Sequence, residues 1–393
     1  MLPTTEIEWR SLFPGHRVDR PTYWQDVVGP LERFDERDCI FARVDLVPGS
    51  ERYREYYTAN PELEPVDGYL RSLPPLGSTA TRADAAIMAS LFATALIAGR
   101  PAEEGGSVGE GGVAARAPVR VPLDPEEAAE RVRSVARHLG ADLVGIGPLN
   151  PAFVYSHVGR TFYGQRWGEE IHLEHPFAIS LGVAMDYDLL RRYTPGFPVI
   201  LESGVAYARA AVMAIQLAHF IRGLGYSARA HHLRDYQVLC VPVAVDAGLG
   251  ELGRVGVLLT REFGSAVRLA TVTTDLAMAV DRPVDLGIQS FCQDCRLCAM
   301  ACPAGAIPRG EKIPFHGVKR WKLAAGRCYR YWRQVGCDCA LCLVACPWSR
   351  PDRETRPLRQ SHPEPALDPP TLEKVKEIRA ALPGWLRKYL DRA

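Results

Sequence analysis

The sequence predicts an α/β core followed by a small module built around iron–sulfur clusters. In the middle of the chain, short apolar runs with strand character alternate with helical segments, which is typical of α/β architectures. In the C-terminal third, nine of the eleven cysteines lie between Cys292 and Cys346. Cysteines at such short, regular spacings are typical of cluster ligands, so we expect this second region to transfer electrons.

The predicted core begins with a capped helix. Asp124 is followed by a proline and two glutamates, which is typical of a helix N-terminus, and Gly140 ends the segment. A longer helix is expected to start at Ser203 and to end at Ile221. Strands are expected over residues 141–147, 177–185, 236–245, 255–260 and 266–274.

Four regions follow from these patterns. We expect an N-terminal region that wraps the core, 1–118, with a Gly-rich loop at 101–118; the α/β core, 119–285; the cluster module, 286–350; and a tail with a short helix, 351–393.

The cysteine spacing predicts two [4Fe-4S] clusters. The first run has x2, x2 and x3 spacing and ends at Cys302-Pro303, and the second has x2 and x3 spacing and ends at Cys346-Pro347. In such doubled runs the cysteine before each proline binds the other cluster. One predicted ligand set is therefore Cys292, Cys295, Cys298 and Cys346, and the other is Cys302, Cys339, Cys342 and one upstream cysteine.

The upstream ligand is either Cys328 or Cys337. A complete second motif would have its cysteine at position 336, where Gly336 stands, and Cys337 is separated from Cys339 by one residue only. That spacing directs two side chains poorly toward one small cluster, so we favour Cys328. Structural zinc also uses Cys-x2-Cys pairs, but the doubled pairs and the two Cys-Pro endings favour iron–sulfur clusters.

Composition argues for an oxidoreductase of the cytoplasm. The 393 residues have a net charge of +1, which does not indicate nucleic acid as a partner. Cys39 and Cys240 stand alone in apolar surroundings, which argues against a disulfide framework. The N-terminus has no recognisable leader, and the apolar run 85–99, expected to be a buried helix, is too short to cross a bilayer.

Two features of the core suggest a large ligand. Tyr207, Ala211, Ala214 and Ala218 share one face of the long helix, which leaves room for a flat body or allows close packing on a sheet. The run GLGELGRVG, residues 248–256, has glycines that permit close backbone approach and an arginine that can pair with an anion. It lacks the hydrophobic spacing and acidic residue of a Rossmann site, so NAD is not expected.

Several segments together resemble the cobalamin-dependent reductive dehalogenase family, in its cytosolic, non-respiratory form, which is related to epoxyqueuosine reductase. They are HPFAISLGVAMDYDLL from residue 175, AHHLRDYQVLCVPVAVDAGLGELGRVG from residue 230, DRPVDLGIQSFCQDCRLCAMACPAGAI from residue 281, and the segments CYRYW and GCDC that contain Cys328 and Cys339. The resemblance implies that Cys328 is a cluster ligand.

The resemblance also implies a nitroreductase-like, cobalamin-binding core with a C-terminal bacterial ferredoxin-like module. The cobalamin would be base-off, without a histidine ligand. In agreement, none of the ten histidines has an aspartate two residues before it, as the Asp-x-His-x2-Gly motif of a histidine ligand requires. The contacts of the corrinoid are expected from Tyr236, Gln237, Val238, Leu239, Gly248, Gly250, Gly253, Arg254 and Gly256.

The function implied is the reductive dehalogenation of a halogenated organic compound by cob(I)alamin. Electrons would come through the two clusters from a separate ferredoxin, flavodoxin or reductase. Tyr207 matches the proton-donating tyrosine of the family, and Arg268 the cation beside it. The aromatic segments at Phe153–Tyr155 and Phe162–Tyr163 favour an aryl substrate.

Two alternatives stay open. An epoxyqueuosine reductase would reduce an epoxide on tRNA and would use an acidic proton donor, and Asp235 lies near the matching position. A corrinoid and iron–sulfur protein that transfers electrons without dehalogenating is the other. We expect no nucleic acid and no membrane among the partners.

Overall fold

The computed structural model describes residues 15–78, 81, 86–87, 89–90, 116–160 and 167–349. Most of the predicted Gly-rich loop, the segment Phe162–Tyr163 and the whole tail with its expected helix lie outside the described residues. Of the run 85–99, the structure describes Ala86, Ile87, Ala89 and Ser90, which are helical and exposed rather than buried.

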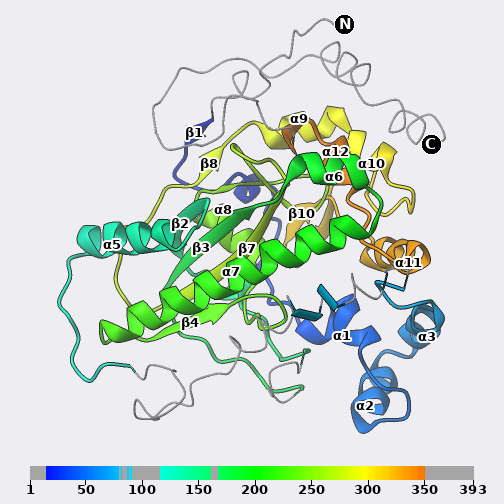
Figure 1. The fold of residues 1–393 in the computed structure, drawn as a ribbon, viewed down its shortest axis with the longest axis horizontal. Helices are drawn as coiled ribbons and strands as arrows, with labels where there is room; N and C mark the ends of the chain where they lie inside the picture. Colours follow the sequence, from blue (N-terminus) through cyan, green and yellow to red (C-terminus); the bar gives the residue numbers. More distant parts are fainter. Residues whose placement is uncertain are drawn as a thin grey trace, which may run out of the picture.

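The centre of the molecule is a four-stranded antiparallel sheet in the order β2-β3-β7-β4 (Figure 1). Its strands are β2 (Leu143–Pro148), β3 (Phe177–Ala184), β7 (Val267–Thr274) and β4 (Ala228–His231). Ile179, Leu181 and Val183 of β3 stand opposite Val272, Ala270 and Arg268 of β7. Directly opposed residues share one face of a sheet, so Arg268 ends a row of buried apolar side chains.

That face of the sheet is covered by α7 (Phe197–Gly223) and α5 (Pro125–His138), while α8 (Cys240–Asp246) contacts β2, β3 and β7. Leu269 of β7, whose side chain points opposite to those of Arg268 and Ala270, belongs to the separate apolar cluster that contains residues of α8. The alanine face of α7 therefore serves close packing on the sheet. Ala211, Ala214 and Ala218 are buried there.

Two predicted elements were wrong in extent or type. The run 236–245 does not form a strand but leads into α8, because a short buried apolar run has no periodicity that separates strand from helix. Pro242 is tolerated in the first turn of α8, where the backbone N–H groups have no partner within the helix. The long helix begins at Phe197, six residues before the predicted start, and Ser203 lies inside it.

By length and composition α7 could also cross a membrane, and it is the only helix in the described part of the chain that could. In this structure it packs on the sheet.

The cluster module consists of short elements around two equivalent turns. Its elements are α9 (Ile288–Cys295), α10 (Leu297–Ala301), β9 (Ile313–Phe315), β10 (Val318–Arg320), α11 (Ala325–Val335) and α12 (Leu341–Ala345). The core strands β5 (Gly250–Leu252), β6 (Leu258–Thr260) and β8 (Val284–Asp285) precede it, and β5 contacts α9. Arg296 and Ala340 occupy the same position in the two Cys-x2-Cys turns, and both have a positive φ, of 51° and 48°. This conformation is unfavourable for residues other than glycine, and its repetition shows that the doubled motif is also a doubled structure.

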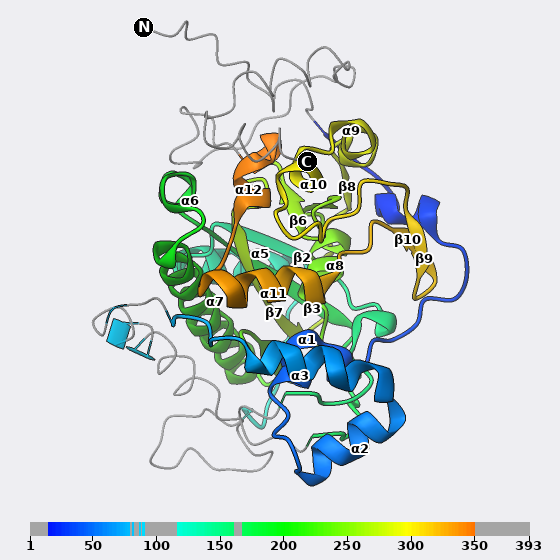
Figure 2. The same cartoon turned by 90° about the vertical axis from the view of Figure 1, so that its right-hand side faces the viewer.

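The N-terminal segment runs along both the core and the module. Strand β1 (His16–Arg17) pairs with β8, and α1 (Ile40–Val44) and α3 (Glu64–Ser72) lie beside α11, with α2 (Glu51–Ala59) beyond them (Figure 2). Ile40, Leu70 and Tyr329 form a small apolar cluster between them. The short helix α6 (Tyr187–Tyr193) connects β3 with α7.

Candidate cofactor cavity and cluster ligands

A cavity of about 460 Å³ lies where β7 begins, between the core and the cluster module. Its walls come from the N-terminal segment, α7, α8, the β5–β6 hairpin and β10. Six predicted site residues line it: Tyr207, Tyr236, Val238, Leu239, Gly256 and Arg268. The predicted catalytic pair and part of the predicted corrinoid contacts therefore meet in one space, although they come from segments up to 61 residues apart.

Tyr207 and Arg268 are in contact. The guanidinium carbon of Arg268 lies 5.1 Å from the centre of the Tyr207 ring. One nitrogen of Arg268 donates a hydrogen bond to Ser203 Oγ at 2.8 Å, whereas Nε is buried and has no hydrogen-bond partner among the described residues. A cation in this position stabilises a phenolate, and a buried free N–H is available to an anionic ligand.

The opposite wall holds further buried donors that sequence reasoning missed. Arg320 and Trp321 line the cavity, and Arg320 Nε and Trp321 Nε1 are buried without partners among the described residues. Burial lowers the pKa of Arg320. The alternation of basic and aromatic residues in FHGVKRWK, from Phe315, is the signal that could have indicated this wall.

Unpaired buried donors cost about 1–3 kcal/mol each, so this wall fits a large ligand with several acceptor oxygens. The amide and phosphate groups at the edge of a corrinoid have this chemistry. His316 also lines the cavity, where its ring stacks on Phe34 with 3.8 Å between the centroids.

Five predicted corrinoid contacts lie elsewhere, with roles that are structural. A Cβ at Gly250 would collide with the backbone of Leu259, and one at Gly253 would lie 2.6 Å from a Leu259 methyl carbon. Gly248 has a φ of 71° and accepts a hydrogen bond from Arg17. Gln237 uses its backbone to hold His231 and Tyr155. These residues are fixed by strand pairing and turns, and they do not line the cavity.

Arg254, the fifth, is fully buried and braces the cluster module. Its guanidinium donates to the backbone carbonyls of Cys292 at 2.8 Å, Pro308 at 2.9 Å, Gly310 at 2.8 Å and Gln293 at 3.3 Å. It also stacks 4.4 Å from the centre of the Trp321 ring. Four of its five N–H donors therefore go to backbone carbonyls of the cluster module, and the pairing of this side chain with a cofactor anion stays a prediction.

The module thiols fall into two electrostatic neighbourhoods. Burial, with a smaller contribution from Cys346, raises the pKa of Cys292 to about 12. After burial, the groups that most raise the pKa of Cys298 are Cys292, Cys346 and Cys295. For the pKa of Cys342 they are Cys339, Cys328 and Cys302. The two neighbourhoods consist of Cys292, Cys295, Cys298 and Cys346, and of Cys302, Cys328, Cys339 and Cys342.

The donor chemistry of both sets fits iron–sulfur clusters. Four buried, mutually repelling thiolates are stable only with a cationic centre between them, which iron supplies. No three Cys, His, Asp or Glu side chains of the described residues converge closely enough to hold one metal ion. A single zinc ion needs such convergence, whereas a cubane holds its cysteines around a wider body.

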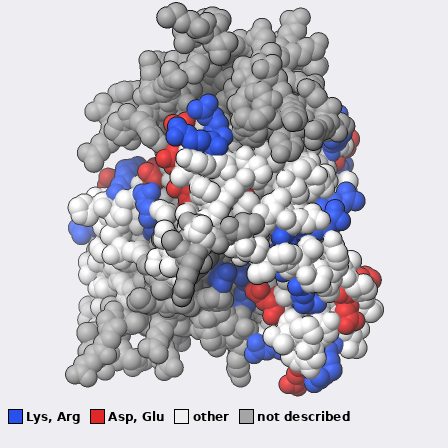
Figure 3. Space-filling model, turned by 45° about the vertical axis from the view of Figure 1, so that its right-hand side comes forward, with Lys and Arg blue, Asp and Glu red and all other residues white. Residues whose placement is uncertain are grey.

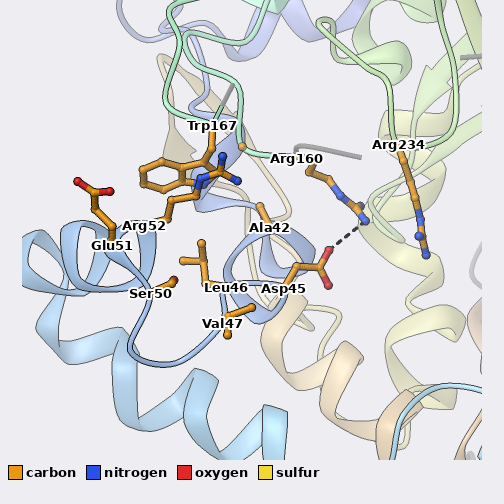
Figure 4. Close-up of a pocket in the computed structure, with 11 residues that line it drawn as sticks. Ala42, Asp45, Leu46, Val47, Ser50, Glu51, Arg52, Arg160, Trp167 and Arg234 are labelled. Carbon is orange, nitrogen blue, oxygen red and sulfur yellow. Dashed lines mark hydrogen bonds and ion pairs between the residues drawn. The ribbon is translucent and has the colours of Figure 1, made fainter. Parts of the chain in front are cut away.

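A second cavity, of about 650 Å³, lies beside α1 and the start of α2 (Figure 4). Arg52, Arg160 and Arg234 line it together with Trp167, and Asp45 accepts from Arg160 at 3.5 Å. The predicted catalytic pair is not among its lining residues.

Asp235, the acid considered for the epoxide alternative, is buried outside the 460 Å³ cavity. Arg229 donates to its carboxylate at 2.9 Å. His231 is likewise engaged, with Thr273 at 3.0 Å.

Comparison with known proteins agrees with the two-part architecture. A family model described as "4Fe-4S dicluster domain" matches residues 291–349. The tetrachloroethene reductive dehalogenase of Dehalobacter restrictus is 32% identical over 271 residues, covering 57% of this chain and 48% of that protein. That of Sulfurospirillum multivorans is 30% identical over 259 residues, with 58% and 51% covered. Epoxyqueuosine reductase of Lactococcus garvieae is 31% identical over 146 residues, with 33% and 36% covered.

Solved structures of reductive dehalogenases have a similar fold. The catabolic reductive dehalogenase NpRdhA matches 96% of this chain with a TM-score of 0.67 and 26% identity, over 47% of its own length. A reductive dehalogenase whose structure suggests a mechanism for B12-dependent dehalogenation matches 96% of this chain with a TM-score of 0.65 and 25% identity, over 48% of its length. This chain thus spans about half the length of the relatives it matches. By sequence and by fold it is a homologue of the reductive dehalogenases, with a 4Fe-4S dicluster domain at its C-terminal side and epoxyqueuosine reductase as a further relative.

Proposed function

We propose that this chain catalyses reductive dehalogenation of a small halogenated aromatic compound. The observation that carries the proposal is the meeting of Tyr207 and Arg268 in a cavity that borders the cysteine-rich module. Replacing a carbon–halogen bond by a carbon–hydrogen bond consumes two electrons and one proton and releases a halide. The site must therefore bind substrate, receive electrons, donate a proton and accept the anion.

Tyr207 is the proposed proton donor. A phenol with a pKa near 10 is a weak acid at neutral pH, and a neighbouring cation makes proton release easier by stabilising the phenolate. The Arg268 guanidinium beside the ring supplies that charge. Its unpaired Nε supplies a donor for the departing halide.

The cavity is the proposed site of a base-off cobalamin. Tyr236, Val238, Leu239 and the backbone at Gly256 would contact it on one side, and Arg320 and Trp321 on the other. When bound, a corrinoid would supply a strong reductant and nucleophile at its cobalt, and the protein would orient the substrate and provide charged groups around it. The two cysteine sets would hold [4Fe-4S] clusters that pass electrons from a separate ferredoxin, flavodoxin or reductase.

The lining of the cavity supports an aryl substrate. Tyr23, Phe34, Phe153 and Tyr155 belong to its wall, and aromatic rings pack favourably on other rings in offset or edge-on arrangements. We therefore expect halogenated phenols to react faster than halogenated alkenes of similar reduction potential.

The epoxide alternative has less support in this geometry, because Asp235 is paired with Arg229 and lies outside the cavity. The described surface in Figure 3 carries its Lys, Arg, Asp and Glu residues in several separate groups. A broad basic face would be the expected footprint of a tRNA partner.

The test is Tyr207→Phe in anaerobically reconstituted protein, assayed for halide release from a halogenated phenol with reduced viologen. We expect normal iron and cobalt content and a rate about 10²–10⁴ lower, the usual contribution of a general acid. Tyr226→Phe is the matched control. Its hydroxyl donates a hydrogen bond of 2.9 Å to the Val121 carbonyl, and Tyr226 does not line the cavity. Equal rates for wild type and Tyr207→Phe would remove Tyr207 from the reaction.

A further inference from the structure

A chain of hydrogen bonds joins the proposed proton donor to the loop of a predicted cluster ligand. Arg268 donates to Ser203 Oγ at 2.8 Å, and Ser203 Oγ donates to Asp338 Oδ2 at 3.1 Å. Ser203 stands one helical turn before Tyr207 on α7, so the hydroxyl and the phenol ring flank the same guanidinium. Asp338 directly precedes Cys339 in the loop between α11 and α12.

The contacts show what fixes Arg268 in place. Among the described residues, Ser203 is the side chain to which Arg268 donates a hydrogen bond, and Arg268 forms no ion pair there. Ser203 is buried, with 5% of its surface exposed. The carboxyl group that reaches Arg268 through hydrogen bonds is therefore that of Asp338, relayed by one hydroxyl.

Arg268 has one donor without a partner. The nitrogen that faces Ser203 is occupied, whereas Nε is buried and has no hydrogen-bond partner among the described residues. A guanidinium that is held through a hydroxyl keeps its charge for the phenol and for the leaving group. A directly bound carboxylate would neutralise it.

We propose that Ser203 and Asp338 are positioning residues that hold Arg268 against Tyr207 during proton donation. The inference rests on the proposed function. In the step concerned, the Tyr207 hydroxyl gives its proton to the substrate carbon, the carbon–halogen bond breaks with two electrons from the external donor, and halide leaves. The phenolate that remains is held by Arg268 until solvent returns a proton.

A consequence is that the cluster loop and the proton donor are mechanically coupled. Asp338 is held by the turn that carries Cys339, and Ser203 by α7. A displacement of that turn shifts the anchor of Arg268, whereas the apolar packing of α7 on the sheet stays unchanged.

The experiment compares Ser203→Ala and Asp338→Asn with wild type, each with and without Tyr207→Phe, using a halogenated phenol and reduced viologen. We expect kcat about tenfold lower in each single variant, within the range of coupling between members of one hydrogen-bond network, with KM unchanged. In the Tyr207→Phe background each substitution should lower the rate by clearly less than in wild type, because the share that acts through the phenol is already lost. Glu202→Gln is the control, because this neighbour on α7 accepts from the Asp186 backbone, outside the network.

Iron content and the EPR spectrum of the reduced protein check that the loop around Cys339 is intact. A loss of rate of the same size in both backgrounds, or full activity of Ser203→Ala and Asp338→Asn, would overturn the positioning role while leaving the dehalogenase proposal standing. Absence of halide release from wild type with full iron and cobalt content would defeat the proposed function, and the inference with it.

Discussion

At the scale of single residues, Arg254 is a fully buried cation that binds only backbone carbonyls. Its hydrogen bonds join the segment that begins at Cys292 to the segment around Pro308. Its guanidinium also stacks on Trp321, which directly follows β10. Four carbonyl groups accept from this one guanidinium, that of Cys292 in a buried hydrogen bond and the other three in part-buried ones, so its removal leaves them without this donor.

We therefore predict that Arg254→Met lowers the free energy of unfolding by about 2–4 kcal/mol and reduces iron retention, even though methionine fills much of the volume. Arg131→Met is the control, because its exposed ion pair with Glu127 contributes only a few tenths of a kcal/mol. Denaturant unfolding and iron analysis measure both effects. Equal stability of the two variants would show that Arg254 is dispensable.

The same residue shows a limit of sequence reasoning. An arginine within a glycine-rich run has the composition of an anion site, and the sequence does not say which carbonyls surround it in space. Tyr207 and Arg268 were named from the family resemblance rather than from periodicity, and the structure places one on α7 and the other on β7.

At the scale of elements, Cys328 and Cys337 differ in what they face. Cys328 lies on α11, and after burial the groups that most affect its pKa are Cys302 and Asp338. Cys337 lies just after α11, and Asp338 is the charged group that affects its pKa. Both Cys328 and Cys337 affect the pKa of Cys339, and the assignment of Cys328 as the fourth ligand stays a prediction.

We predict that Cys328→Ala loses about four irons per chain and the signal of one cluster, whereas Cys337→Ala keeps about eight irons. Iron and sulfide analysis with low-temperature EPR distinguishes them. Loss of iron from Cys337→Ala, with Cys328→Ala intact, would reverse the assignment.

Elements with strong local signals were predicted well, and weak ones were not. The cap, proline and first-turn acids of α5 are all present, and Asp124 accepts from the backbone of Glu126 and Glu127 at 3.0 Å. The segment before α8 carries β-branched residues that fit either a strand or a buried helix, and contact with the sheet decided for the helix.

At the scale of the whole molecule, two buried carboxyl groups tie the N-terminal segment to the core. Burial raises the pKa of Glu36 to about 7 and that of Asp246 to about 7. Glu36 accepts from the backbone of Gly159 and Arg160, and Asp246 accepts from Tyr23. Between about pH 4.5 and 7 the folded protein therefore binds more protons than the unfolded chain, and stability falls as the pH rises through this window.

Glu36→Gln removes one of these titrations and keeps an acceptor oxygen. We predict that the free energy of unfolding of the variant, minus that of wild type, rises by an amount on the order of 1–3 kcal/mol between pH 5 and pH 8. Denaturant unfolding at the two pH values measures this difference. A pH-independent difference would mean that Glu36 is ionised in the folded protein throughout.

The order of the strands could not be read from the sequence. The alternation of strands and helices predicted the fold class, yet β4 pairs with β7 across some 36 residues that contain α8 and a hairpin. Such pairings depend on which faces are left to cover once the long helix has packed. The cavity forms at the meeting of these distant segments, which is why its second wall, Arg320 and Trp321, was missed.

The proposed function requires that one chain binds two clusters and a corrinoid. The most direct test is anaerobic reconstitution with iron, sulfide and cobalamin, followed by metal analysis and low-temperature EPR. We predict about eight irons and one base-off cobalt per chain. Eight irons with no bound cobalt would contradict it and leave an electron carrier without a site for dehalogenation.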